Sequence, residues 1–156
     1  TLSGDFEDEV ITTIGAYSFS SCPVNNLRFK KAEALKGFAF ADAKKLNTII
    51  FDKRIAMSEF FPFQNSTVSK VVFKNGLSSW ATLPFHAAAS VTSLVFGGEF
   101  TSLTGSGFFD PTKIVTGDGY VYVPAALVDT YKGATNWTVY GDKIRAIEDY
   151  PGIEEF

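Results

Sequence analysis

The side chains that most often carry enzymatic chemistry are few and scattered in this chain. His86 is the only histidine, and it has neither a cysteine nor a second histidine with which to form a zinc site. No nucleophile-elbow sequence supports a serine–histidine–aspartate arrangement around it. The carboxylates Asp52, Glu59 and Glu99 could act as an acid–base pair in glycoside hydrolysis only if they converged, yet they occupy different phases of a sequence repeat. We therefore expect no catalytic site, no cofactor and no metal site.

Two further motifs have structural explanations. The GDG sequence at Gly117–Gly119 predicts a turn before a strand, because the pattern of a phosphate-binding loop is missing around it. Cys22 occupies a repeat position at which Ala43, Ser66 and Ala88 stand in other copies. That position requires a small side chain, so Cys22 is expected to pack, and a lone cysteine excludes an intrachain disulfide.

The net charge of −3 is unevenly distributed over the 156 residues. Four acidic residues lie in 1–9 and four in 148–156, which leaves nine against 14 Lys and Arg, so residues 10–147 carry about +5. A basic region of this kind can attract anionic glycans or acidic proteins, although ordinary solvated surface charge also explains the excess of Lys and Arg. The basic stretch at 28–74 has no nucleic-acid-binding motif, so we expect no nucleic acid as partner. No apolar run approaches the roughly 20 residues of a spanning helix, so we expect no membrane insertion.

The dominant feature of the chain is a repeat of 21 to 24 residues that would have to position any functional side chain. It reads apolar-x-x-small-Phe, then a polar turn, then apolar-x-x-apolar-x-Phe. Copies begin at Ile11, Ala32, Ile55 and Leu77, and a degenerate fifth copy begins at Phe100. Self-similarity at this period predicts a solenoid in which each repeat shares its core with its neighbours.

Each copy predicts a short apolar segment, a tight turn around a first phenylalanine, and a strand whose alternate residues point inward. Stacked strands would form a parallel sheet on one face, and the turns would close the other. The expected inward residues of the strands are Leu27, Phe29, Ile49, Phe51, Val71, Phe73, Leu94, Phe96, Val121 and Val123.

The pattern changes after Pro124, which ends the last strand. Residues 125–132 have helical spacing, and Asn136 is expected to cap a second short helix. The apolar residues of that helix would be Trp137, Tyr140 and Ile144.

These patterns divide the chain into four parts. We expect the solenoid over residues 10–124, a helical C-terminal cap over 125–147 and an acidic tail over 148–156. Residues 1–9 show no comparable cap, so they are expected to be the remnant of upstream sequence that covers the first repeat.

The segment ITTIGAYSFSSC, followed by VNNLRF, resembles the BspA-type leucine-rich repeat, whose pattern begins I-x-x-I-G-x-x-A-F-x-x-C-x-x-L. Later copies depart from it, since Lys36, Ser58 and Ala81 replace Gly15. The ending VYVPAALVDTYKGATNWTVYGDKIRAI is similar to the C-terminal segment of many such proteins. The matching residues of the first copy are Ile11, Ile14, Gly15, Phe19, Cys22 and Leu27.

The resemblance implies an α/β-type leucine-rich-repeat solenoid, mostly β, wound as a right-handed superhelix of about five repeats with a small helical C-terminal cap. It also implies an extracellular or cell-surface location in a bacterium. Some proteins of this family bind host matrix proteins or other cells, and the family has no shared catalytic residues. The expected function is a non-catalytic adhesion or interaction module, with a host or bacterial surface protein or a glycan as partner.

The candidate binding face consists of outward-pointing residues of the predicted sheet. An apolar central column with a rim of Lys, Thr and Tyr is a plausible docking surface. The alternative is that β-branched residues merely stack well across parallel strands. The candidate residues are Arg28, Ile50, Val72, Val95 and Tyr122 in the central column, and Thr48, Lys70, Lys74 and Tyr120 beside it.

A structural role is the main alternative function. The repeats could space other domains, or they could pair end to end through the uncapped N-terminal repeat. An enzyme with a site that the sequence does not reveal is the remaining alternative.

Overall fold

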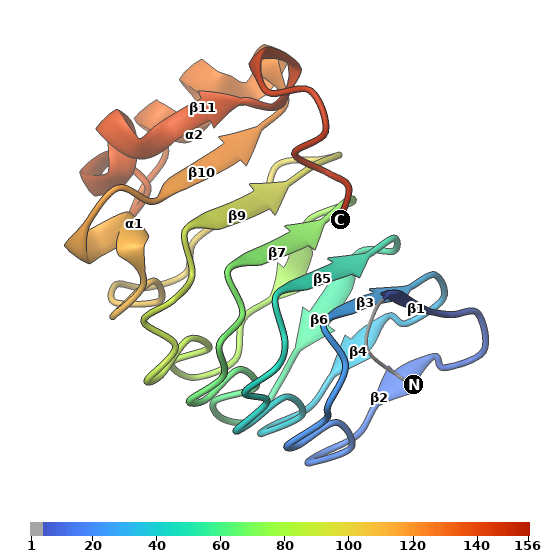
Figure 1. Cartoon of the computed structure of the whole chain (residues 1–156). Coiled ribbons are helices and arrows are strands. Elements are labelled where there is room, and N and C mark those ends of the chain that lie inside the picture. Colours follow the sequence, from blue (N-terminus) through green and yellow to red (C-terminus); the bar gives the residue numbers. More distant parts are fainter. Residues whose placement is uncertain (1–4) are drawn as a thin grey trace.

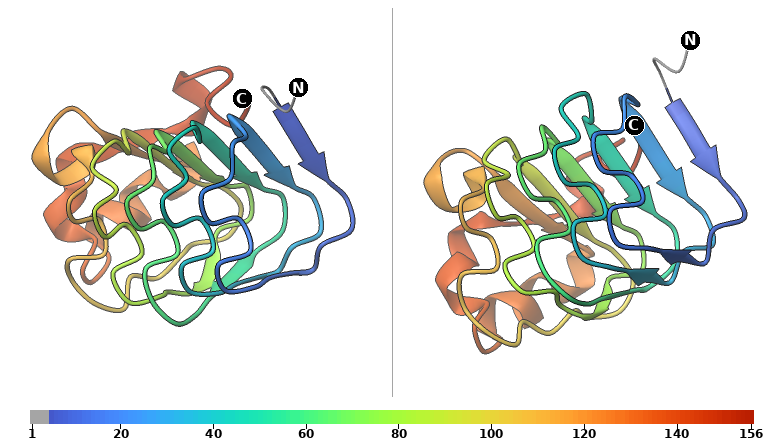
Figure 2. Two further views of the ribbon diagram at one scale, coloured as in Figure 1. Left: turned by 60° about the horizontal axis from the view of Figure 1, so that its bottom comes forward. Right: turned by 90° about the horizontal axis from the view of Figure 1, so that it is seen from below.

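The computed structural model describes residues 5–156, so the part of the predicted N-terminal segment formed by residues 1–4 lies outside it. The chain winds into coils that stack in sequence order (Figure 1, Figure 2). Strands of successive coils form two parallel sheets, one of seven strands in the order β1-β3-β5-β7-β9-β10-β11 and one of four in the order β2-β4-β6-β8. This is the stacked solenoid that the repeat predicts.

The strands are short in both sheets. The larger sheet contains β1 (Asp5–Asp8), β3 (Asn26–Phe29), β5 (Thr48–Phe51), β7 (Lys70–Phe73), β9 (Ser93–Phe96), β10 (Tyr120–Val123) and β11 (Ile144–Ala146). The smaller sheet contains β2 (Thr13–Ile14), β4 (Ala34–Leu35), β6 (Ile55–Met57) and β8 (Leu77–Ser79). The helical elements are α1 (Lys113–Thr116), η1 (Ala125–Leu127), α2 (Val128–Gly133), η2 (Thr138–Lys143) and η3 (Ile147–Asp149).

A ladder of phenylalanines forms the centre of the core. Phe29, Phe51, Phe73 and Phe96 lie opposite one another in adjacent strands. Their rings stack with centroid separations of 5.6, 5.3 and 5.5 Å, and all four are fully buried. The ten strand residues predicted to point inward all lie in the main core cluster, so that prediction is confirmed.

The turns on the other side of the coil are held by hydrogen bonds between coils. The amide of Phe19 donates to the carbonyl of Ala39, and the amide of Phe40 donates to that of Pro62, both at 2.8 Å. Tyr17 and Phe38 adopt left-handed φ values of 60° and 56° in corresponding turns. That conformation is unfavourable for bulky residues, and the bonds between coils maintain it.

The N-terminal end differs from the prediction. Residues 5–8 form β1, which pairs in register with β3 and so extends the sheet beyond the predicted start of the solenoid at residue 10. Phe6 lies opposite the inward-pointing Leu27 but is 44% exposed, because no further coil lies on it within the described residues.

The C-terminal cap is only partly helical. The predicted first helix is present as η1 and α2, but Ile144 begins strand β11, which pairs with β10. Asn136 does not cap a helix as predicted. The helical segment η2 begins at Thr138, so Trp137 and not Asn136 stands at its N-cap position. The side-chain amide of Asn136 instead donates to the carbonyl of Leu103 at 2.8 Å and so joins the cap to the preceding coil.

Candidate functional site

The structure places the nine predicted face residues on the outer surface of the seven-stranded sheet. In-register parallel strands align residues at the same position into rows across that surface. Thr48, Lys70 and Tyr120 form one row, and Arg28, Ile50, Val72, Val95 and Tyr122 form the central row. Lys74 directly follows β7 and lies on the same surface, on the other side of the central row from Lys70.

The expectation that the central row faces solvent is wrong. Ile50, Val72 and Val95 are at most 1% exposed, and Tyr122 is 7% exposed. They form a second apolar cluster outside the sheet, with Ile147 and Ile153 packed against it. The prediction of an accessible surface failed because period-two alternation indicates only on which side of the sheet a residue lies. It does not indicate which other segment covers that side.

The cover is the C-terminal segment Ile147–Phe156, most of which was predicted to be an acidic tail. In Figure 1 it runs from the cap back across the sheet toward β7. The rings of Tyr150 and Tyr122 meet edge to face at 4.9 Å. The carboxylate of Glu155 lies 3.7 Å from Lys74 Nζ, and Lys70 Nζ donates to the carbonyl of Glu155. One signal in the sequence could have revealed this contact, namely two isoleucines among acidic residues opposite rows that contain lysines.

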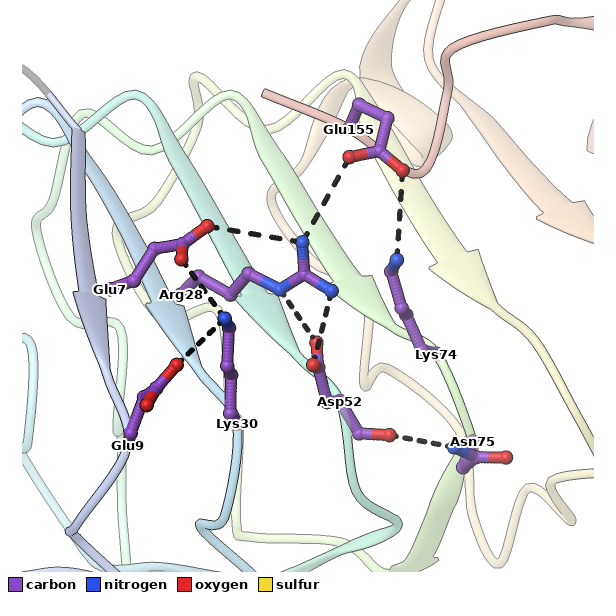
Figure 3. Close-up of polar contacts among 8 residues, drawn as sticks. All are labelled: Glu7, Glu9, Arg28, Lys30, Asp52, Lys74, Asn75 and Glu155. Atoms are coloured by element: carbon purple, nitrogen blue, oxygen red, sulfur yellow. Dashed lines mark hydrogen bonds and ion pairs between the residues drawn. The ribbon is translucent and has the colours of Figure 1, made fainter.

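The other half of the face, over β1, β3 and β5, carries a network of charges (Figure 3). Arg28 donates from Nε and Nη2 to the two carboxylate oxygens of Asp52, at 2.9 and 3.1 Å. Lys30 Nζ lies 3.1 Å from Glu7 and 2.9 Å from Glu9. Its hydrogen bond and charge hold the pKa of Glu9 below the usual value, and the hydrogen bond to Asp52 raises the pKa of Arg28.

The remaining candidates differ in how accessible they are. Thr48 is buried. Burial lowers the pKa of Lys70, although Glu155 opposes the shift. The guanidinium of Arg145 lies 4.3 Å from the centre of the Tyr120 ring, a cation–π distance. The accessible part of the face is thus the charged network together with the rim around the C-terminal segment.

The residues considered for catalysis are not brought together. Asp52 binds Arg28 on the outer face, whereas Glu59 accepts a hydrogen bond from the amide of Gly37 in a turn. Glu99 lines a hollow of about 280 Å³ together with Lys53, Arg54 and Asn75. The ring of His86 packs against Phe61 with centroids 4.8 Å apart. Across residues 5–156, no three His, Cys, Asp or Glu side chains are grouped so as to hold a metal ion.

Comparison with known proteins agrees with the coiled architecture. The profile of the BspA type leucine-rich repeat region matches residues 8–117 in six copies, one more than the repeats counted in the sequence. No match was found among curated proteins or among solved structures. In the described part of the chain, no helix has the length and apolar character needed to cross a bilayer. Since the family profile covers most of the chain and the coils stack as such repeats require, the protein belongs to the BspA-type leucine-rich repeat family.

Proposed function

We propose that the chain is a non-catalytic interaction module of a bacterial cell-surface or secreted protein, and that it binds a protein or a glycan through the outer face of its seven-stranded sheet. Family membership supports a repeat-based interaction role, because proteins with such repeats are generally non-enzymatic and extracellular. The location and the partner are part of the proposal.

One observation carries the choice of face. The parallel register aligns charged side chains of three neighbouring strands into a fixed and partly accessible array. Arg28, Lys30 and Asp52 have side chains that are 21%, 33% and 24% exposed, and each is held by at least one ion pair. A preorganised array of this kind recognises a partner without the cost of ordering free side chains.

The test is binding of the purified chain to arrays of host matrix proteins and glycans, at low and at physiological salt. We expect a specific signal that survives physiological salt and is lost in the double variant Lys30→Glu, Lys74→Glu. Lys132→Glu is the matched control, because it makes the same change of charge at an exposed position of α2. A signal that disappears once salt screens the charges would indicate non-specific attraction and contradict specific binding. A signal that the double variant leaves unchanged would contradict binding through this face.

A structural role is the second candidate, and the exposed end of the solenoid favours it. Phe6 and Val10 are 44% and 80% exposed at the end where β1 lies. Apolar side chains at the end of a stack of repeats become buried when another repeat unit covers them. The end of a second copy could provide that cover.

A further inference from the structure

We propose that the outer face of β7, β9 and β10 is a binding site for an extended peptide that combines aliphatic and acidic residues, and that the chain's own segment Tyr150–Phe156 covers it as a displaceable strap. The inference rests on the proposed function of the sheet face and specifies the partner chemistry and the regulation of that face.

The apolar contacts show what the site accepts. Ile153 packs against the row formed by Val72, Val95 and Tyr122, and Tyr150 lies edge to face on the ring of Tyr122. The row itself is almost fully buried. Without a cover it would be a continuous apolar patch on the sheet. Exposed apolar patches of this kind on soluble proteins mark binding sites.

The charges show why the occupant is acidic. The carboxylate of Glu155 lies 3.7 Å from Lys74 Nζ and 4.0 Å from Arg28 Nη1 (Figure 3). The carbonyl of Glu155 also accepts a hydrogen bond from Lys70 Nζ. Three cationic side chains from β3 and from β7 and its end thus converge on one residue of the segment. A peptide with a carboxylate two residues after an aliphatic side chain would reproduce these contacts.

The segment is held loosely, in contrast to the residues just before it. Its backbone bonds form local turns, as when the amide of Ile153 donates to the carbonyl of Tyr150 and that of Glu155 to Gly152. No hydrogen bond between two backbone groups joins Tyr150–Phe156 to the sheet within the described residues. By comparison, Glu148 is anchored, since its carboxylate accepts from the amide of Ala125 at 3.0 Å.

Exposure leads to the same conclusion. The side chain of Glu155 is 64% exposed, and Tyr150 and Phe156 are 39% and 40% exposed. The segment also curves around a hollow of about 350 Å³ that is lined only by its own residues and those of η3. Exposed ion pairs at such distances hold a segment weakly, so a peptide of the same chemistry can replace it.

The experiment uses the full chain and a labelled synthetic peptide with the sequence of residues 147–156, IEDYPGIEEF. The wild-type segment competes at the high effective concentration of an intramolecular ligand. The double variant Ile153→Ser, Glu155→Lys releases it, so we expect the peptide to bind this variant on the order of tenfold more tightly, or better, than it binds the wild type. Glu155→Gln alone, at an exposed side chain that does not threaten the fold, should give a smaller gain.

Matched controls identify the site. Adding Lys74→Glu to the released variant should abolish peptide binding, whereas adding Lys132→Glu should not. A peptide with the four acidic residues replaced by lysine should not bind. Equal peptide affinity in the wild type and in the double variant Ile153→Ser, Glu155→Lys would overturn the strap. The site itself would be overturned if neither this double variant nor Glu155→Gln bound the peptide while circular dichroism showed both to be folded.

The outcome is separable from that of the proposed function. If Lys30→Glu, Lys74→Glu abolishes binding to an array partner while no variant binds the peptide, the sheet face is a binding surface and the present inference fails. If the peptide binds as expected but the double variant Lys30→Glu, Lys74→Glu leaves array binding unchanged, the peptide site is supported. In that case the proposal that the array partner binds through the sheet face fails.

Discussion

At the scale of single residues, Thr101 joins the repeats to the cap. It is fully buried, and its amide donates to Tyr131 Oη at 2.8 Å while its carbonyl accepts from Trp137 Nε1 at 2.9 Å. Its hydroxyl accepts from the amide of Leu77 at 3.0 Å. Every polar group of this residue is therefore paired within the core.

Tyr131→Phe should leave the amide of Thr101 buried without a partner. The free energy of unfolding should fall by about 1–3 kcal/mol, the cost of an unpaired buried donor. Urea denaturation followed by circular dichroism measures it. Tyr140→Phe is the control, because its hydroxyl has no hydrogen bond within the described residues, and an equal loss in both variants would contradict the role of Thr101.

At the scale of elements, the phenylalanine ladder joins successive coils through the centre of the core. Phe51 stacks on Phe29 and Phe73 at 5.6 and 5.3 Å, so Phe51→Ala removes a ring from the middle of the stack. Unfolding free energy should fall by about 3–5 kcal/mol. Phe60→Ala, at a ring that is 53% exposed, should cost less than about 1 kcal/mol. Thermal unfolding of both variants compares them, and similar losses would show that stacking between coils is not the main source of stability.

The first strand should respond to acid before the rest of the sheet. Lys30 holds the pKa of Glu9 below its ordinary value of about 4.3, so this pairing stabilises β1 fully above that value and is lost as the pH falls through the lowered pKa. We expect hydrogen exchange of the amides between β1 and β3, corrected for intrinsic rates, to accelerate below about pH 4. Glu9→Gln should weaken this dependence, and an unchanged profile in that variant would assign it to another carboxylate.

The sequence predicts those elements that depend on local period and misses those that depend on distant partners. Alternation placed all ten inward strand residues correctly, because the pleat alone determines their side. It could not place Ile153 on the cluster that contains Val72 and Val95, since that packing joins two stretches with no shared pattern. β1 was missed because residues 5–8 carry only the strand part of the repeat. The predicted cap at Asn136 was wrong because its side chain bonds to the carbonyl of Leu103, which is distant in the sequence.

At the scale of the whole molecule, the two ends of the solenoid differ. Trp137 and Tyr131 close the C-terminal end and are fully buried, whereas Phe6 and Val10 stand exposed beside β1 at the other end. Acidic side chains on β1 limit edge pairing with other sheets, yet they do not cover these apolar groups. We propose that this exposed end is a site of contact between copies of the chain.

We expect a concentration-dependent dimer in sedimentation velocity. Phe6→Ser should weaken it by at least about tenfold, because burial of a phenylalanine contributes on the order of 1.5–3 kcal/mol. Phe6 is exposed in the single chain, so its replacement leaves the fold intact and changes only the contact between copies. Val139→Ser is the matched control, since it removes an apolar side chain that is 78% exposed in η2, within the cap at the opposite end. A chain that stays monomeric at every concentration, or a dimer that Phe6→Ser leaves unchanged, would rule out assembly through this end and leave the sheet face as the interaction surface.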